Sequence, residues 1–87
     1  MPGKSFKVDI VTPEKTIYSG SAFSMVIPSE SGYLGILAGH AALIANTVSG
    51  RVTLDNGSKE RLDIMVKAKG FVEVSGNSVN LLLDEAC

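Results

Sequence analysis

Arg51-Val52-Thr53-Leu54-Asp55-Asn56-Gly57-Ser58 gives the clearest local evidence of how this chain folds. Its first half alternates polar and apolar side chains, as a strand with one buried face does. Asn56-Gly57 then gives the strongest hairpin signal, because both residue types tolerate the positive φ that a type I′ turn requires at its centre. The returning run, residues 61–66, again places apolar side chains on one face. The stretch therefore predicts two antiparallel strands joined by a turn at Asn56-Gly57.

The same alternation extends outward on both sides of this hairpin. Near the start, Phe6, Val8 and Ile10 point one way, and Pro13 ends the pairing. Near the end, Ser75-Gly76-Asn77-Ser78 separates two apolar runs and predicts a second hairpin. We expect strands over residues 6–10, 16–18, 23–27, 41–47, 51–54, 61–66, 71–74 and 79–83.

The composition favours an all-β domain. Nine Val, six Ile and four Thr stand against seven Ala and no Gln, a balance that favours strands over helices. The 87 residues have the size of one domain, so we expect residues 1–87 to form a single unit. About eight to ten short strands cannot all lie in one sheet with a solvated face. We therefore expect a β-sandwich of two antiparallel sheets.

The charge and hydropathy of the chain exclude several classes of function. A net charge of −1 lacks the basic footprint of a nucleic-acid binder and the polybasic patch of a lipid binder. The longest apolar stretch, Tyr33 to Ala45, is too short for a membrane-spanning helix, which needs about 20 residues. Residues 1–7 lack the apolar run of a signal peptide. We expect no membrane-spanning segment.

The chemical inventory is sparse. His40 is the only histidine and Cys87 the only cysteine, so no nucleophile–base pair and no metal-ligand spacing can be recognised. The glycines between Gly32 and Gly39 lack the lysine and the helix of a phosphate loop, and we expect them to mark bends or bulges. We expect no catalytic residue, no metal site and no cofactor. One cysteine fits a reducing compartment.

A longer segment carries a family signature. In Ser31-Gly32-Tyr33-Leu34-Gly35-Ile36-Leu37-Ala38-Gly39-His40-Ala41-Ala42-Leu43, two glycines precede an aliphatic pair, and a histidine then enters a strand. This segment resembles the signature of the ATP synthase epsilon subunit family, called delta in mitochondria. Lys7 to Glu14 with Tyr18-Ser19-Gly20, and Gly70 to Val74, resemble further family segments in the same order.

The chain also departs from the family pattern. Ala38 and Ala42 stand where the family often has proline, and Lys69 stands where a second glycine is common. Most members continue into a C-terminal helical hairpin, whereas this sequence stops at Cys87, so we expect a short form or a cut form. With no hairpin and no phosphate loop, we expect neither ATP binding nor inhibition of ATP hydrolysis.

The resemblance implies a flattened, non-catalytic β-sandwich in the rotor of an F-type ATP synthase. Such a subunit joins the gamma stalk to the c-subunit ring and helps couple proton translocation to ATP synthesis. It would lie peripherally, as part of the complex, on the cytoplasmic face of the inner or energy-transducing membrane. The residues implied to contact the c ring are Glu30, Ser31, Gly32, Tyr33 and Leu34. The residues implied to face gamma are Thr12, His40 and Ala45.

Other interpretations stay open at this point. A small β-sandwich interaction module of another assembly would have the same fold without the c-ring contact. An enzyme would require His40 or Cys87 to act without visible partners. For His40, a purely structural role, in which the residue satisfies backbone groups after Gly39, stands beside contact with gamma.

Overall fold

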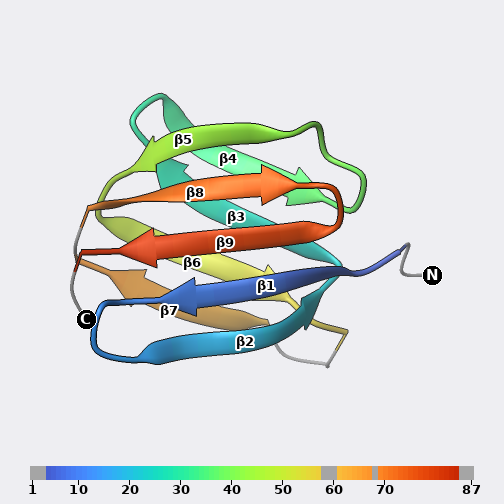
Figure 1. Ribbon diagram of the computed structural model, residues 1–87, viewed down its shortest axis with the longest axis horizontal. Helices are drawn as coiled ribbons and strands as arrows, with labels where there is room; N and C mark the ends of the chain where they lie inside the picture. Colours follow the sequence, from blue (N-terminus) through green and yellow to red (C-terminus); the bar gives the residue numbers. More distant parts are fainter. Residues whose placement is uncertain (1–3, 58–60, 68, 85–87) are drawn as a thin grey trace.

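The computed structural model describes residues 4–57, 61–67 and 69–84, and these residues form strands and their connections without any helix (Figure 1). Ser58 and Cys87, which figured in the sequence analysis, lie outside the described residues. The strands are β1 (Phe6–Val11), β2 (Thr16–Ala22), β3 (Ser24–Ser29), β4 (Gly32–Leu37), β5 (Leu43–Thr47), β6 (Gly50–Asp55), β7 (Leu62–Val66), β8 (Gly70–Ser75) and β9 (Ser78–Leu83).

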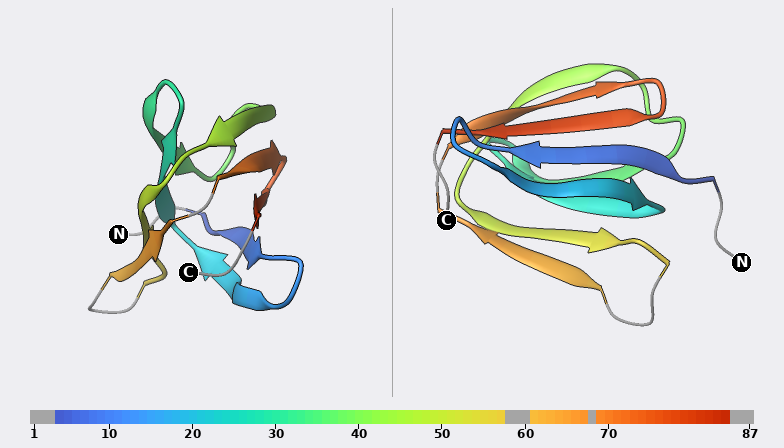
Figure 2. Two further views of the ribbon diagram at one scale, coloured as in Figure 1. Left: turned by 90° about the vertical axis from the view of Figure 1, so that its left-hand side faces the viewer. Right: turned by 60° about the horizontal axis from the view of Figure 1, so that its bottom comes forward.

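The strands form one hydrogen-bonded sheet that curls into two layers. Its order is β2-β1-β9-β8-β5-β3-β6-β7, with β4 paired to β3. The strands β2-β1-β9-β8-β5, here called layer A, pack face to face with β4-β3-β6-β7, here called layer B (Figure 2). Between β5 and β6 the chain passes from layer A to layer B at Val48 and Ser49. Strand β3 pairs with both sides of this bend, as Ser29 lies opposite Thr47 and Val26 opposite Thr53. The expected all-β sandwich is confirmed.

One strand pair differs from the antiparallel arrangement that we expected. Strands β1 and β9 run parallel, with Lys7 opposite Ser78 and Val11 opposite Leu82. The other described pairs are antiparallel. The exception arises because these two strands come from distant parts of the sequence, so no hairpin turn dictates their relative direction.

The core lies between the layers and follows the period-two pattern of the strands. In β1 every second residue from Phe6 is buried, and in β9 every second residue from Val79 is buried. Burying one aliphatic side chain contributes about 1.5–3 kcal/mol, so this shared core holds the layers together. Its members are Phe6, Val8, Ile10, Ala22, Met25, Ile27, Ile36, Val52, Leu54, Val66, Val72, Val74, Val79, Leu81 and Leu83.

Both predicted hairpins are present, but one turn was assigned wrongly. The β8–β9 hairpin closes as expected, with Ser75 opposite Ser78 and Gly76 at φ 59°. In the β6–β7 hairpin Leu54 pairs with Leu62, so the connection is longer than the two-residue turn that Asn56-Gly57 predicted. Gly57 has φ 89°, whereas no described residue other than glycine has positive φ, which excludes a type I′ turn. Instead, the N–H of Gly57 donates to the Asp55 carboxylate at 3.1 Å.

Strand β4 was not predicted. Sequence analysis expected no strand between residues 27 and 41 and interpreted the glycines there as bends or bulges, yet Gly32–Leu37 pairs with β3 along its whole length. The two-residue turn Glu30-Ser31 brings this segment back beside β3, and Gly32 adopts φ 116° directly after it. Glycine therefore serves turn closure here, and the rest of the segment is a regular strand.

Candidate partner interfaces

The β3–β4 turn carries the first group of residues that resemblance assigned to a partner. Glu30 and Ser31 form its exposed tip. The turn is fastened to β5, because the N–H of Glu30 donates to the Asn46 carbonyl at 3.2 Å and the Asn46 amide donates to the Glu30 carboxylate at 3.3 Å. The hydroxyl of Ser29 donates across the turn to the carbonyl of Gly32. The tip is thus a braced projection at one end of the molecule.

The strand that follows separates the last two residues of this group. Tyr33 is 67% exposed and lies on the outer face of layer B. Leu34 points the other way and packs, half-buried, against the core. Residues 30–33 therefore form a continuous exposed surface, and Leu34 supports it from within.

The residues assigned to gamma occupy three different environments. Thr12 is buried, and its hydroxyl accepts the N–H groups of Glu14 and Lys15 at 3.3 and 3.1 Å, which closes the turn after β1. The N–H of His40 donates to the Leu37 carbonyl at 3.1 Å, and its Nδ1 lies 2.8 Å from the Ala41 carbonyl, which accepts from the Nδ1–H tautomer. These contacts satisfy the backbone after Gly39, as the structural interpretation of His40 expects.

Ala45, the third of these residues, is half-buried in β5 and faces the core. The strand register also shows that the three residues are spread out. Thr12 follows β1 at the end of the molecule that carries the Glu30 turn, whereas His40 precedes β5 at the opposite end, beside the β8–β9 turn (Figure 1). The fold does not bring Thr12, His40 and Ala45 together on one surface.

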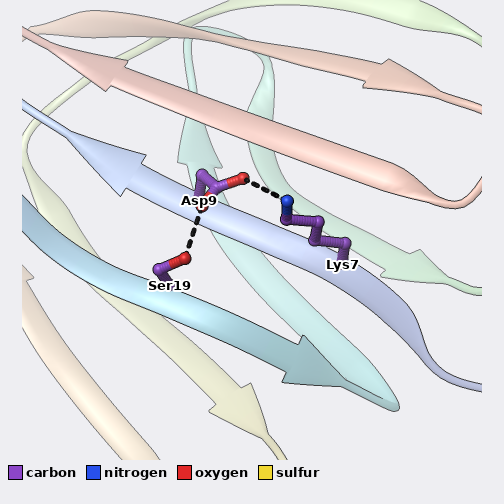
Figure 3. A network of polar contacts seen from close by, with 3 residues as sticks. All are labelled: Lys7, Asp9 and Ser19. Atoms are coloured by element: carbon purple, nitrogen blue, oxygen red, sulfur yellow. Dashed lines mark hydrogen bonds and ion pairs between the residues drawn. The ribbon is translucent and has the colours of Figure 1, made fainter.

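The outer face of layer A combines a polar network on β1 and β2 with exposed apolar side chains on β5 and β8. On β1, the Asp9 carboxylate accepts a hydrogen bond from the Ser19 hydroxyl of β2 at 2.7 Å and lies 3.9 Å from the ammonium of Lys7 (Figure 3). In the strand register, Asn80 of β9 lies opposite Asp9, and Glu73 of β8 lies opposite Asn80. These polar side chains therefore continue the row across the layer. On β1 and β2 the charges of this face therefore have neighbours of their own, whereas Ile44 of β5, opposite Glu73, is 70% exposed and Phe71 of β8 is 41% exposed.

The outer face of layer B also exposes large apolar side chains, which sequence analysis did not identify. Val26, Tyr33, Leu37 and Met65 are large apolar side chains exposed on this face. Between β3, β6 and β7 the surface forms an open hollow of about 310 Å³. It is lined by Val26, Tyr33, Gly50, Arg51, Thr53 and Met65. The signal available in the sequence was an apolar residue at an outward position, as at Val26 between the inward-facing Met25 and Ile27.

Two further open hollows, of about 290 and 380 Å³, lie on layer A, the first beside Glu30, Lys69 and Asp84 and the second beside Ile44 and Glu73. Within the part of the chain that the structure describes, no three His, Cys, Asp or Glu side chains gather in a way that could bind a metal ion. Nor does this part of the chain contain a helix of the length and hydropathy that a membrane span requires. What the geometry does present is a small two-layer β domain with exposed surfaces suited to protein contacts.

Comparison with known families places this domain. Residues 5–87 match the family described as the β-sandwich domain of the ATP synthase delta/epsilon chain, and the chain belongs to this family. It is 36% identical over 84 residues to the ATP synthase epsilon chain of Leptospira interrogans, covering 97% of this chain and 65% of the relative. It is 42% identical over 82 residues to the epsilon chain of Chlorobium limicola, covering 94% of this chain and 92% of that relative.

Solved structures show the same fold. A mitochondrial ATP synthase assembly of Euglena gracilis, containing OSCP, F1 and the c ring, includes a chain that matches with a TM-score of 0.82 at 18% identity, over 92% of this chain and 51% of that one. The central stalk and c ring of Tetrahymena thermophila mitochondrial ATP synthase give a TM-score of 0.76 at 17% identity, over 91% and 63% of the two chains. At these identities the likeness concerns the fold alone.

Proposed function

We propose that this chain is a non-catalytic central-stalk subunit of an F-type ATP synthase, which links the gamma stalk to the c-subunit ring and helps couple proton translocation to ATP synthesis. The observation that carries the proposal is the family match over residues 5–87, together with curated relatives named ATP synthase epsilon chain. The chain spans about two thirds of the Leptospira relative and nearly all of the Chlorobium relative. The subunit would sit peripherally at the cytoplasmic face of the energy-transducing membrane, held there by the complex.

The exposed surface of residues 30–33 is proposed to face the c ring. A braced tip that combines a carboxylate at Glu30 with an aromatic anchor at Tyr33 suits contact with a polar loop. Leu34 would position this surface from beneath. Thr12, His40 and Ala45 are proposed to lie toward gamma, with Thr12 and Ala45 acting through the backbone that they shape.

Reconstitution tests this proposal. Membranes depleted of their own epsilon subunit should regain proton-driven ATP synthesis when the chain is added with gamma and the catalytic head from the same organism. Tyr33→Ala should impair assembly more than Glu30→Ala, because an exposed ion pair adds at most about 1 kcal/mol. Recovery of ATP synthesis without any added chain, or failure of the chain to co-purify with gamma, would contradict a central-stalk role.

A further inference from the structure

The Asn56-Gly57 pair that follows β6 combines two features that make an asparagine side chain chemically unstable. An asparagine amide can be attacked by the backbone nitrogen of the next residue, and asparagine is among the thermolabile residue types. Glycine in the next position hinders this attack least, because it has no Cβ. Both residues are exposed, so water can reach them. No other asparagine in the sequence precedes glycine, since Asn46, Asn77 and Asn80 are followed by threonine, serine and leucine.

The fold itself requires glycine at position 57. Gly57 has φ 89°, and a Cβ there would lie 2.7 Å from the ring of Phe23. Any other residue would have to displace the ring and adopt a strained backbone conformation. Packing therefore maintains the reactive Asn56-Gly57 pair.

The Gly57 nitrogen has a partner that bears on this reaction. Its N–H donates to the Asp55 carboxylate at 3.1 Å, in the local turn that Asp side chains form with the backbone two residues ahead. The nitrogen can attack only after it has lost this proton, because its lone pair is otherwise delocalised into the peptide bond. A neighbouring carboxylate disfavours the negative charge that the deprotonated nitrogen carries. Asp55 thus keeps the nucleophile in its unreactive form.

We infer that Asn56 is a site of spontaneous deamidation, and that the Asp55 carboxylate slows the reaction in the folded chain. The deprotonated Gly57 nitrogen forms a bond to Cγ of Asn56. The bond from Cγ to the amide nitrogen breaks, and that nitrogen leaves as ammonia after taking up a proton in place of the one that Gly57 lost. A water molecule then opens the cyclic imide at one carbonyl or the other, which gives aspartate or isoaspartate. Nothing is oxidised or reduced, and water is the only co-reactant.

The products act on the contact between β3 and the β6–β7 hairpin. In the imide the Gly57 nitrogen carries no hydrogen, so its bond to Asp55 is lost. The new carboxylate at position 56 then lies next to Asp55 and repels it. Isoaspartate also adds a methylene to the main chain directly after β6, where the Asp55 carbonyl accepts the Phe23 N–H at 2.7 Å and Asp55 pairs with Ser24. Deamidation therefore weakens the attachment of this hairpin.

The test follows the purified chain during incubation at neutral pH and physiological temperature. Trypsin places Asn56 in the peptide 52–59 and Asn77 in the peptide 70–87, so tandem mass spectrometry measures the two separately. Conversion at Asn56 should be about 10-fold or more faster than at Asn77, which is also exposed in a hairpin turn but precedes serine. An isoaspartate-specific methyltransferase should label the peptide 52–59. Conversion at Asn56 that is no faster than at Asn77 would overturn the proposed site.

The role of Asp55 is tested with and without a substitution. Asp55→Ser keeps a short side chain that can accept the Gly57 N–H and removes the charge, so conversion at Asn56 should accelerate about threefold or more. The unmodified chain should also react faster when it is unfolded in urea, because the fixed contact with Asp55 is then lost. If the folded and unfolded chains react at the same rate, or if Asp55→Ser reacts more slowly, the protective role of Asp55 is wrong.

The effect on the hairpin is measured on aged protein. Chain that has been incubated until most of Asn56 has converted should have a lower urea midpoint than fresh chain. Asn56→Gln, aged in the same way, should keep its midpoint, because the longer side chain closes the corresponding ring far less readily. Equal midpoints for fresh and converted chain would contradict the inferred weakening of the β6–β7 hairpin.

Discussion

The two outer faces of this small sandwich are built by the same alternation and yet arrange their side chains differently. Layer A combines a polar row with exposed Ile44 and Phe71, whereas layer B places most of its exposed apolar side chains around one hollow. On layer A, Asp9 is held by Ser19 and Lys7, and the row continues into polar side chains. On layer B, Met65 and other large apolar side chains are exposed, and Arg51 forms no ion pair with another described residue. Both faces cover one core, so folding does not demand the difference. The residue types on an outer face reflect what that face contacts. The residue types on the inner face reflect the packing of the core.

The two layers should unfold as one cooperative unit, because they share one core. Leu81 in layer A and Leu54 in layer B are each fully buried. Replacing either by alanine should lower the free energy of unfolding by about 2–5 kcal/mol, a large share of the stability of so small a domain. Urea unfolding followed by circular dichroism should show one cooperative transition in both variants. Two separate transitions, or a large cost in one layer only, would mean that the layers fold independently.

The turns of the two layers can be compared directly, because each layer has a hairpin closed by a glycine with positive φ. Gly57, beside layer B, has φ 89°, and a Cβ there would lie 2.7 Å from the ring of Phe23. Gly76, in layer A, has φ 59° and open space around it. Gly76→Ala should cost about 1–2 kcal/mol from backbone strain alone. Gly57→Ala should cost about 1–3 kcal/mol more, because the ring must move. Equal shifts in melting temperature would contradict the tight contact with Phe23.

Polar side chains on the two faces should differ in what they contribute to folding. Ser19→Ala removes the hydrogen bond to Asp9 and should cost about 0.5–1.5 kcal/mol. Arg51→Met keeps the apolar stem and removes a charge that has no described partner, so stability should stay within about 0.5 kcal/mol. The urea midpoints of the two variants, measured under the same conditions, test both expectations. A larger loss for Arg51→Met would show that the Arg51 guanidinium contributes to folding.

The smallest expected effect concerns the ion pair on layer A. The Lys7 ammonium lies 3.9 Å from Asp9, and the Lys7 side chain is 68% exposed. Such a pair contributes at most about 1 kcal/mol and is screened by salt. Lys7→Met should therefore lower the urea midpoint slightly at low ionic strength, and the difference from the unmodified chain should vanish near 1 M sodium chloride. A salt-independent loss would point to packing of the lysine stem as the cause.

Sequence patterns captured most of this fold because most of it is local. The period-two runs at β1 and at β8–β9 identified their strands and inner faces directly. Strand β4 was missed because Gly32 and its neighbours look like a loop, and only pairing with β3 makes them a strand. The parallel pairing of β1 with β9 leaves no local trace at all. The length of the β6–β7 connection was equally hidden, since it depends on register across the pair.

The sequence predicted the candidate sites less well than it predicted the fold. Residues 30–34 were singled out by resemblance, and the fold adds that residues 30–33 are exposed, that Asn46 braces the turn and that Leu34 packs against the core. Thr12 and His40 were grouped by resemblance as well, but only the topology shows that they lie at opposite ends. Arg51 attracted no attention in the sequence, because a charged residue at an outward strand position is ordinary. Only the fold shows that Arg51 lines a hollow together with apolar side chains from other strands.

The parallel pairing of β1 with β9 also has a consequence for the order in which this molecule assembles. The four hairpins, β1–β2, β3–β4, β6–β7 and β8–β9, each join neighbouring strands and can form within microseconds. Layer A is completed only when Lys7 and Ser78, at distant points of the sequence, come together. Such long loop closures slow folding, which places domains of this topology in the millisecond-to-second range. On a ribosome, β1 would emerge early and wait for its partner until nearly all of the sandwich had been synthesised.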